Sequence, residues 1–231
     1  MNRFKYIPLI LLTFSLMVSG RNYFQSGTTW IVKNTPGISG PIQFPPSMDT
    51  FFLSRHGESE ELRFYHSKEG DDAAPEFLFW IKSEADQVFF RPKNNPDTTW
   101  YLMYDFSLIP GESKYIYHYL GDTIKPRRSY VKCVDIENSP ENPAIVLMRM
   151  KIGRDETLQY TDKGFWIKGM GSECGVERND WFSWDGGNKQ IWEIYNNGNH
   201  ILSTDALPQK YLLPESPNEN SCKCGCSENS D

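Results

Sequence analysis

The fold class is indicated most clearly by residues 144–152, which read Ala-Ile-Val-Leu-Met-Arg-Met-Lys-Ile. Within this stretch Met148, Met150 and Ile152 alternate with Arg149 and Lys151. Successive side chains of a β-strand point to opposite faces of the sheet, so a period of two gives this segment one apolar face and one charged face. We therefore predict a strand that covers a core on one side and contacts water on the other.

Ten further segments predict short strands, because each alternates or is rich in aromatic and β-branched residues. Tyr115, Tyr117 and Tyr119 repeat the period of two. Turn signals of Gly, Pro and Asn separate the segments, and no stretch of ten or more residues has a convincing helical period. The pattern predicts an all-β fold, either an antiparallel β-sandwich or a partly open barrel with long loops. The ten segments are 28–32, 50–53, 62–66, 76–82, 87–91, 100–106, 114–120, 129–136, 164–168 and 190–195.

Residues 1–20 have the pattern of a secretory signal peptide. Arg3 and Lys5 give a positive start, residues 7–18 carry no charge and are mostly apolar, and small residues for cleavage are present at 18–20. The alternative is an N-terminal membrane anchor, but the apolar run is shorter than the ~20 residues that a bilayer requires. We expect an exported protein, periplasmic or extracellular, with no membrane span in the mature chain.

The mature chain is predicted to be a single acidic domain. The whole chain has 231 residues, 14% of them aromatic, and a net charge of −6; cleavage after residue 20 leaves 22 Lys and Arg against 30 Asp and Glu, a net charge of −8. This length suits one domain, which we place at 21–213, followed by a disordered polar tail at 214–231. The acidic balance argues against a nucleic-acid partner, because phosphate contacts need clustered Lys and Arg.

The chain contains an odd number of cysteines: Cys133, Cys174, Cys222, Cys224 and Cys226. Export permits disulfides, and an odd count leaves at least one thiol unpaired within the chain. A Cys133–Cys174 bridge is possible from the sequence. The three tail cysteines are either a soft-metal ligand set or exposed thiols open to oxidation. Their spacing falls short of the usual zinc pairs, so we expect no metal and no cofactor.

Residues 53–59, Leu-Ser-Arg-His-Gly-Glu-Ser, resemble the signature of the histidine phosphatase (phosphoglycerate mutase-like) family. In that family the histidine attacks phosphorus while arginines hold the phosphate oxygens, which would assign these roles to Arg55 and His56. The family is α/β and needs a second histidine, whereas here the motif precedes another strand-like run. His118 lies in a tyrosine-rich strand and His200 in a turn-like segment. A secreted hydrolase using Arg55 and His56 is therefore the alternative function.

A second resemblance covers more of the chain. Residues 104–108 read Tyr-Asp-Phe-Ser-Leu, residues 121–123 read Gly-Asp-Thr, and residues 166–172 read Trp-Ile-Lys-Gly-Met-Gly-Ser. This order resembles a large family of uncharacterised exported proteins of Bacteroidetes-type bacteria, over roughly residues 76–205. Lys168 stands where that family usually has Glu. The resemblance implies an exported protein and supplies no known reaction.

The same motifs allow physical predictions. Asp105 is expected to accept hydrogen bonds from the backbone of the turn that follows it, as Asx residues do. Gly169, Gly171 and Gly175 are expected to supply bulges or positive φ where a strand bends around a packed Trp166. The alternative is that Trp166 and the glycine backbone line a ligand groove.

No coherent catalytic set is found, so the sequence favours a non-catalytic binding or surface-interaction protein whose ligand is a glycan or a protein. Tryptophan combines a large apolar surface with a polar N–H group, which suits binding faces as well as cores. The alternative for each of these tryptophans is that its indole ring packs in the core. The candidate ligand-binding residues are Trp166, Trp181, Trp184 and Trp192.

Overall fold

The computed structural model describes residues 22–35, 45–55, 61–68, 74–95, 98–119, 126–158, 161–175, 188–203 and 207. The predicted signal segment and tail lie outside these residues. Within them the fold is all-β, and none of them forms a helix long and apolar enough to cross a membrane. The strands are β1 (Thr28–Thr35), β2 (Ser47–Arg55), β3 (Leu62–Lys68), β4 (Glu76–Glu84), β5 (Gln87–Pro92), β6 (Tyr101–Asp105), β7 (Ser113–His118), β8 (Arg127–Asn138), β9 (Val146–Gly153), β10 (Thr161–Ile167), β11 (Gly171–Ser172), β12 (Asn188–Asn196) and β13 (Asn199–Ser203).

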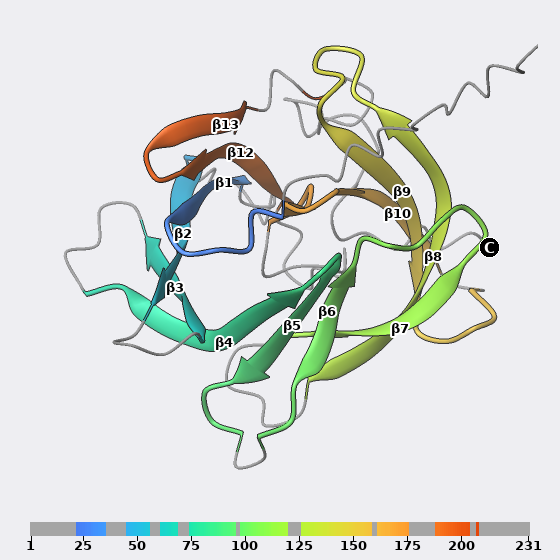
Figure 1. Ribbon diagram of the computed structural model, residues 1–231, viewed down its shortest axis with the longest axis horizontal. Helices are drawn as coiled ribbons and strands as arrows, with labels where there is room; N and C mark the ends of the chain where they lie inside the picture. The colour runs from blue at the N-terminus through green and yellow to red at the C-terminus, as the bar shows by residue number, and fades with distance from the viewer. Residues whose placement is uncertain are drawn as a thin grey trace, which may run out of the picture.

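The described strands form two antiparallel sheets. The first has the order β13-β12-β1-β2-β3-β4-β5-β6, and the second has the order β11-β10-β9-β8-β7. Figure 1 shows the first sheet curled into a half-barrel, with the second sheet standing opposite its open side. Most neighbours are consecutive along the chain, and the pairing of β12 with β1 brings the end of the chain back to its beginning. The predicted antiparallel all-β fold is confirmed.

Alternation in β9 follows the sequence prediction. Met148, Met150 and Ile152 are fully buried, whereas Arg149 is exposed and Lys151 is half-buried. The apolar side chains face the core between the sheets, and the charged ones face outward. Burial of a large apolar side chain contributes about 1.5–3 kcal/mol, so this one strand contributes substantially to stability.

A row of rings in mutual contact crosses the inner face of the half-barrel. Phe51, Phe64, Phe79 and Phe90 lie on the four successive strands β2 to β5 and are all buried. Successive ring centroids are 5.5, 4.7 and 5.6 Å apart. Aromatic pairs at such distances contribute about 0.5–1.5 kcal/mol beyond their burial. Part of the high aromatic content of the sequence thus fills this concave face.

The glycine-rich turn after β10 bends around Trp166, as predicted. The backbone φ angles of Gly169, Gly171 and Gly175 are 76°, 119° and 118°, values that side chains with a Cβ rarely adopt. The Trp166 ring is fully buried and meets Tyr104 edge-on, with centroids 5.2 Å apart. The turn and the buried indole therefore form part of the core that joins the two sheets.

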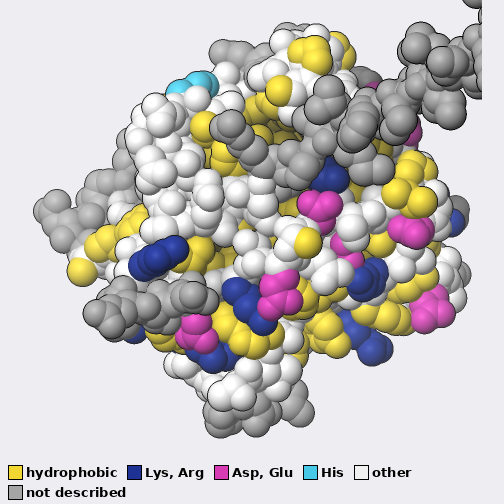
Figure 2. Space-filling model, viewed as in Figure 1, with side chains coloured by type: hydrophobic (Ala, Val, Ile, Leu, Met, Phe, Trp, Pro, Cys, Tyr) yellow, Lys and Arg dark blue, Asp and Glu magenta, His cyan; other side chains and the backbone are white. Residues whose placement is uncertain are grey.

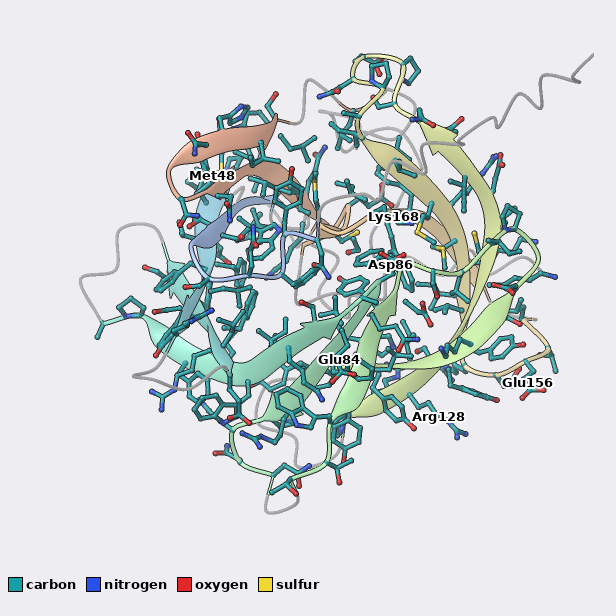
Figure 3. All side chains as sticks on the ribbon, in the orientation of Figure 1. Met48, Glu84, Asp86, Arg128, Glu156 and Lys168 are labelled. Atoms are coloured by element: carbon teal, nitrogen blue, oxygen red, sulfur yellow. The ribbon has the colours of Figure 1, made fainter. Side chains whose placement is uncertain are left out.

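Polar contacts from the same turn fasten the second sheet to the first. The indole N–H of Trp30 donates to the carbonyl of Met170 at 2.9 Å. Lys168 lies beside Asp86 of the β4–β5 turn, with Nζ and Oδ2 3.5 Å apart (Figure 3). Lys168, which departs from the pattern of the resembling family, thus has an acidic partner of its own in this chain.

Asp105 ends β6 and is almost fully buried. Its Oδ1 accepts from the backbone N–H of Ser107 at 3.1 Å and from the Ser107 hydroxyl at 2.5 Å, which confirms the predicted turn role. Its Oδ2 accepts from Gln87 Nε2 at 2.7 Å and from Lys114 Nζ at 2.5 Å. Burial alone would raise the pKa of Asp105. The hydrogen bonds outweigh that effect, and the pKa lies below its ordinary value.

The Cys133–Cys174 bridge, which the sequence left open, does not form. Cys133 is a free, buried thiol on the inner face of β8, in register with Met150. Cys174 is disulfide-bonded, so its partner lies outside the described residues. The Cys133 side chain is used for packing, and burial raises its pKa.

Candidate functional site

The four tryptophans predicted as ligand-binding residues lie in different parts of the structure. Trp166 is fully buried, so it fills the core and lines no groove. Trp181 and Trp184 lie outside the described residues. Trp192 on β12 is half-buried, and Lys33 Nζ lies 4.7 Å from its ring centroid. Only Trp192 is therefore placed at the surface among the described members of this set.

The residues considered for phosphatase chemistry are not brought together where the structure describes them. Arg55 is exposed at the end of β2, and His56 lies outside the described residues. His118 on β7 is buried and lies 2.5 Å from the Ser129 hydroxyl. His200 is exposed on β13, in the other sheet.

A different group of aromatic residues covers the outer face of the half-barrel. In β4 and β5 the buried Phe79 and Phe90 alternate with Trp80, Phe89 and Arg91, which are half-buried on the outer face. The strand register then sets cations beside rings: Trp80 is paired with Arg91 on one side and with Arg63 of β3 on the other. Neighbours in register on one face are close enough to interact directly.

These side chains form one continuous row, which we call the cation–aromatic ladder. The Arg63 guanidinium carbon lies 4.5 Å from the Trp80 centroid and 5.2 Å from that of Phe77. The Arg91 guanidinium carbon lies 5.4 Å from Trp80 and 5.0 Å from Trp100. Lys82 Nζ lies 4.9 Å from Trp100 and 5.4 Å from Phe89. In spatial order the ladder is Phe77, Arg63, Trp80, Arg91, Trp100, Lys82 and Phe89.

Each contact in the ladder is within the ~6 Å range of a cation–π interaction, which contributes about 0.5–1 kcal/mol at an exposed site. Together they fix the rings and the cations relative to one another. The space-filling view shows hydrophobic and basic side chains side by side in the lower part of the molecule, over β4 and β5 (Figure 2). The ladder is therefore a rigid surface with apolar and hydrogen-bonding groups at regular intervals.

The charges of the ladder are only partly neutralised. Arg91 donates to Glu61 at 2.8 Å, and Lys82 contacts Glu84 at 2.6 Å. Arg63 forms no ion pair within the part of the chain that the structure describes, and its buried Nε has no hydrogen-bond partner there. The ladder thus carries three positive charges against two negative ones, on a protein that is acidic overall.

Further rings extend this surface toward β2. Phe52 and Tyr65 are stacked, with centroids 5.2 Å apart and planes 10° apart. Tyr65 lies 5.8 Å from Phe77, the first ring of the ladder. The aromatic outer surface therefore crosses the four strands β2 to β5.

A second charged cluster lies on the inner face of the half-barrel. Asp49 Oδ2 is 3.1 Å from His66 Nε2 and 3.8 Å from Lys189 Nζ, and the His66 ring stacks on Phe51 at 4.6 Å. Burial would raise the pKa of Asp49, but contacts with His66 and Asn34 lower it. The charge of Lys189 lowers it further, so the pKa lies below its ordinary value. The Asp49 carboxylate therefore has its basic neighbours within this cluster.

Comparisons with protein-family models, curated proteins and solved structures find no match to this chain. Membership of the exported Bacteroidetes-type family therefore stays a prediction from the sequence motifs. The ladder itself was accessible only in part to sequence reasoning. Alternation in β4 and β5 separates inner from outer residues, but the cross-strand register that sets each cation beside a ring is not visible in a single strand.

Proposed function

We propose that this chain is an exported, non-catalytic binding protein that holds a glycan carrying carboxylate or sulfate groups along the cation–aromatic ladder. The observation that carries the proposal is the alternation of fixed rings with cations, in which Arg63 has no acidic partner among the described residues. Export is part of the proposal and is supported by the pattern of residues 1–20.

The ladder suits the chemistry of a sugar chain. A sugar ring has apolar C–H faces and a polar rim, so it gains from an aromatic side chain beside a hydrogen-bond donor. Trp80 and Trp100 supply the apolar surface, and guanidinium groups such as that of Arg63 bind carboxylates and sulfates through several N–H groups at once. The aromatic surfaces and the guanidinium groups occur side by side over a single sheet face.

A polypeptide partner fits this surface less well. The desolvated centres of protein–protein interfaces are enriched in Trp, Tyr, Phe and Arg but depleted in Lys, Glu and Asp. The ladder includes Lys82 and lies beside the carboxylates of Glu61 and Glu84, and each of these three charges would have to lose water against a protein core. A ligand that keeps its own polar groups beside the cations avoids this cost.

Binding of polyuronates and sulfated polysaccharides, measured by isothermal titration calorimetry against neutral dextran, tests the proposal. We expect Arg63→Gln and Trp80→Ala to weaken binding at least tenfold. The matched control is Arg128→Gln, because Arg128 also packs on a ring, 4.3 Å from the Tyr115 centroid, but does so on β7 and β8 of the other sheet (Figure 3). This control should change affinity less than twofold.

Two results would count against the proposal. One is equal loss of affinity in Arg63→Gln and Arg128→Gln, which would mean that the contact is general electrostatic attraction. The other is the absence of saturable binding to any anionic polysaccharide together with capture of a defined protein by the ladder, which would establish the protein alternative. Circular dichroism of each variant controls for unfolding.

A further inference from the structure

A groove lies in the second sheet, away from the ladder. It has a volume of about 440 Å³ and is lined by Gly111, Lys132, Cys133, Val134, Lys151, Thr157 and Leu158. Its wall consists of β8 and β9, the turn before β7 and the loop after β9 (Figure 1). We call it the lysine groove, and its volume is in the range of small-molecule sites.

Two lysines face each other in this groove. Lys132 of β8 is directly opposite Lys151 of β9, and like charges in this position destabilise a sheet. Neither lysine forms an ion pair with any residue that the structure describes. The same strands do pair opposite charges nearby, since Arg149 contacts Asp135 at 2.5 Å. On its other side Lys151 is in register with Lys163 of β10, so three lysines stand in one cross-strand row, and a bound anion between Lys132 and Lys151 would reduce the repulsion.

The acidic side chains of the adjoining turns accept hydrogen bonds from groups within those turns. Glu112 accepts from the backbone N–H of Ile109 at 3.1 Å. Asp155 accepts from the backbone N–H and hydroxyl of Thr157, at 3.0 and 2.6 Å. These contacts orient the two carboxylates within the turns on either side of the groove, and neither carboxylate forms an ion pair with Lys132 or Lys151 among the described residues.

Apolar groups line the rest of the groove. A β-bulge between Cys133 and Asp135 leaves Val134 outward and 39% exposed, as bulges commonly re-aim a side chain. Ile109, 58% exposed, lies two residues before the lining Gly111. Leu158 has φ of 51°, which is strained for a bulky residue, and such strain is concentrated at functional sites.

We propose that the lysine groove binds a small amphiphilic anion. The carboxylate or sulfate head lies between Lys132 and Lys151, and a short aliphatic part lies on Val134 and Leu158. The two lysines attract the anionic head, and the exposed apolar side chains provide a surface for the tail. The proposal is independent of the ladder, because the two surfaces belong to different sheets.

Titration of the purified protein with octanoate, octyl sulfate, octanol and acetate, each below its micellar concentration, tests the inference. We expect one molecule of octanoate or octyl sulfate to bind at least tenfold more tightly than octanol or acetate, because octanol lacks the charge and acetate lacks the tail. A preference between octanoate and octyl sulfate identifies the natural head group.

Variants decide whether the site is the lysine groove. Lys151→Gln should weaken octanoate binding at least tenfold and raise the melting temperature of the free protein, since it removes the repulsion. Val134→Thr keeps the side-chain shape and should weaken octanoate and octyl sulfate alike. The control is Lys93→Gln, because Lys93 pairs with Glu76 in the other sheet at 3.0 Å. Unchanged affinity in Lys151→Gln, or equal losses in Lys151→Gln and Lys93→Gln, would overturn the proposal.

Discussion

Asp105→Asn should destabilise the fold strongly for a substitution that replaces one oxygen by an NH₂ group. Asp105 is 1% exposed and accepts four hydrogen bonds. In the variant, Oδ1 still accepts from Ser107, but the new amide N–H₂ faces two donors, Gln87 Nε2 and Lys114 Nζ. A hydrogen bond to a charged group contributes about 1.5–3 kcal/mol, and a bond to a neutral group about 0.5–1.5.

Lys114 is 42% exposed, so its ammonium group regains water when it moves away. Losing its hydrogen bond should therefore cost the lower end of the range for a charged group, about 1.5 kcal/mol. The half-buried Gln87 contributes a similar amount. The expected decrease in the free energy of unfolding is on the order of 2–3 kcal/mol at pH 7, measured by urea unfolding. That is a large part of the total stability of a typical domain.

The pH dependence gives a second check on Asp105. Its pKa is lower in the folded protein than the ordinary value of 3.8, so the folded state holds the charged form more strongly. The stabilisation is present above pH 3.8 and is lost as pH falls through the folded pKa. The difference between wild type and Asp105→Asn should therefore shrink from pH 7 to pH 3.

A matched control is present in the chain. Asp155 accepts from the backbone N–H and hydroxyl of Thr157 in the same two-residue arrangement, but it is exposed and has no counterpart of Gln87 or Lys114 among the described residues. Asp155→Asn should cost far less. Equal losses in the two variants, or a loss below about 0.5 kcal/mol in Asp105→Asn, would refute the reasoning.

Three further outcomes are expected. Met150→Ala should cost about 2–5 kcal/mol in urea unfolding, because the side chain is fully buried, whereas Met150→Leu should cost under about 1.5 kcal/mol; similar costs would mean that this strand is loosely packed. Asp49→Asn should flatten the loss of stability between pH 5 and pH 3, because the pKa of Asp49 is also lowered in the folded state; an unchanged acid profile would contradict the cluster. Cys133 should react with iodoacetamide far more slowly in the native protein than in urea, as read by mass spectrometry of its peptide; rapid native labelling would show that β8 opens.

Phe-Trp-Ile-Lys occurs both at 79–82 and at 165–168, and the sequence alone does not predict which of these side chains are buried. Both segments are strand-associated, as the pattern predicts. In β4 the phenylalanine faces the core and Trp80 faces outward, but in β10 both Phe165 and Trp166 are buried. Alternation determines that neighbours point to opposite faces. In β10 it is Trp166 that faces the core, in register with Met148 and against Tyr104, and the opposite face with Phe165 is covered as well. Such covering depends on contacts that are remote in sequence.

Register shifts limit prediction in a second way. Phe77 and Trp80 are three residues apart, so strict alternation places them on opposite faces. Both belong to the ladder because the pairing with β3 shifts between Phe64 and Tyr65. The shift also leaves Leu78 buried next to Phe79. No residue type in β4 predicts this bulge, so the outer aromatic surface could not be derived from the sequence of this strand alone.

The rigidity of the ladder is the feature that connects the fold to the proposed function. A flexible Trp or Arg loses conformational entropy when a ligand immobilises it, at about 0.5–1.5 kcal/mol per side chain. Trp80 already lies between Arg63 and Arg91. Its neighbour in the strand, Phe79, is packed against Phe64 on the inner face. Part of the ordering cost is met during folding, so a ligand would lose less of the contact energy. Removing a cation should therefore weaken binding even where the ligand contacts only the ring.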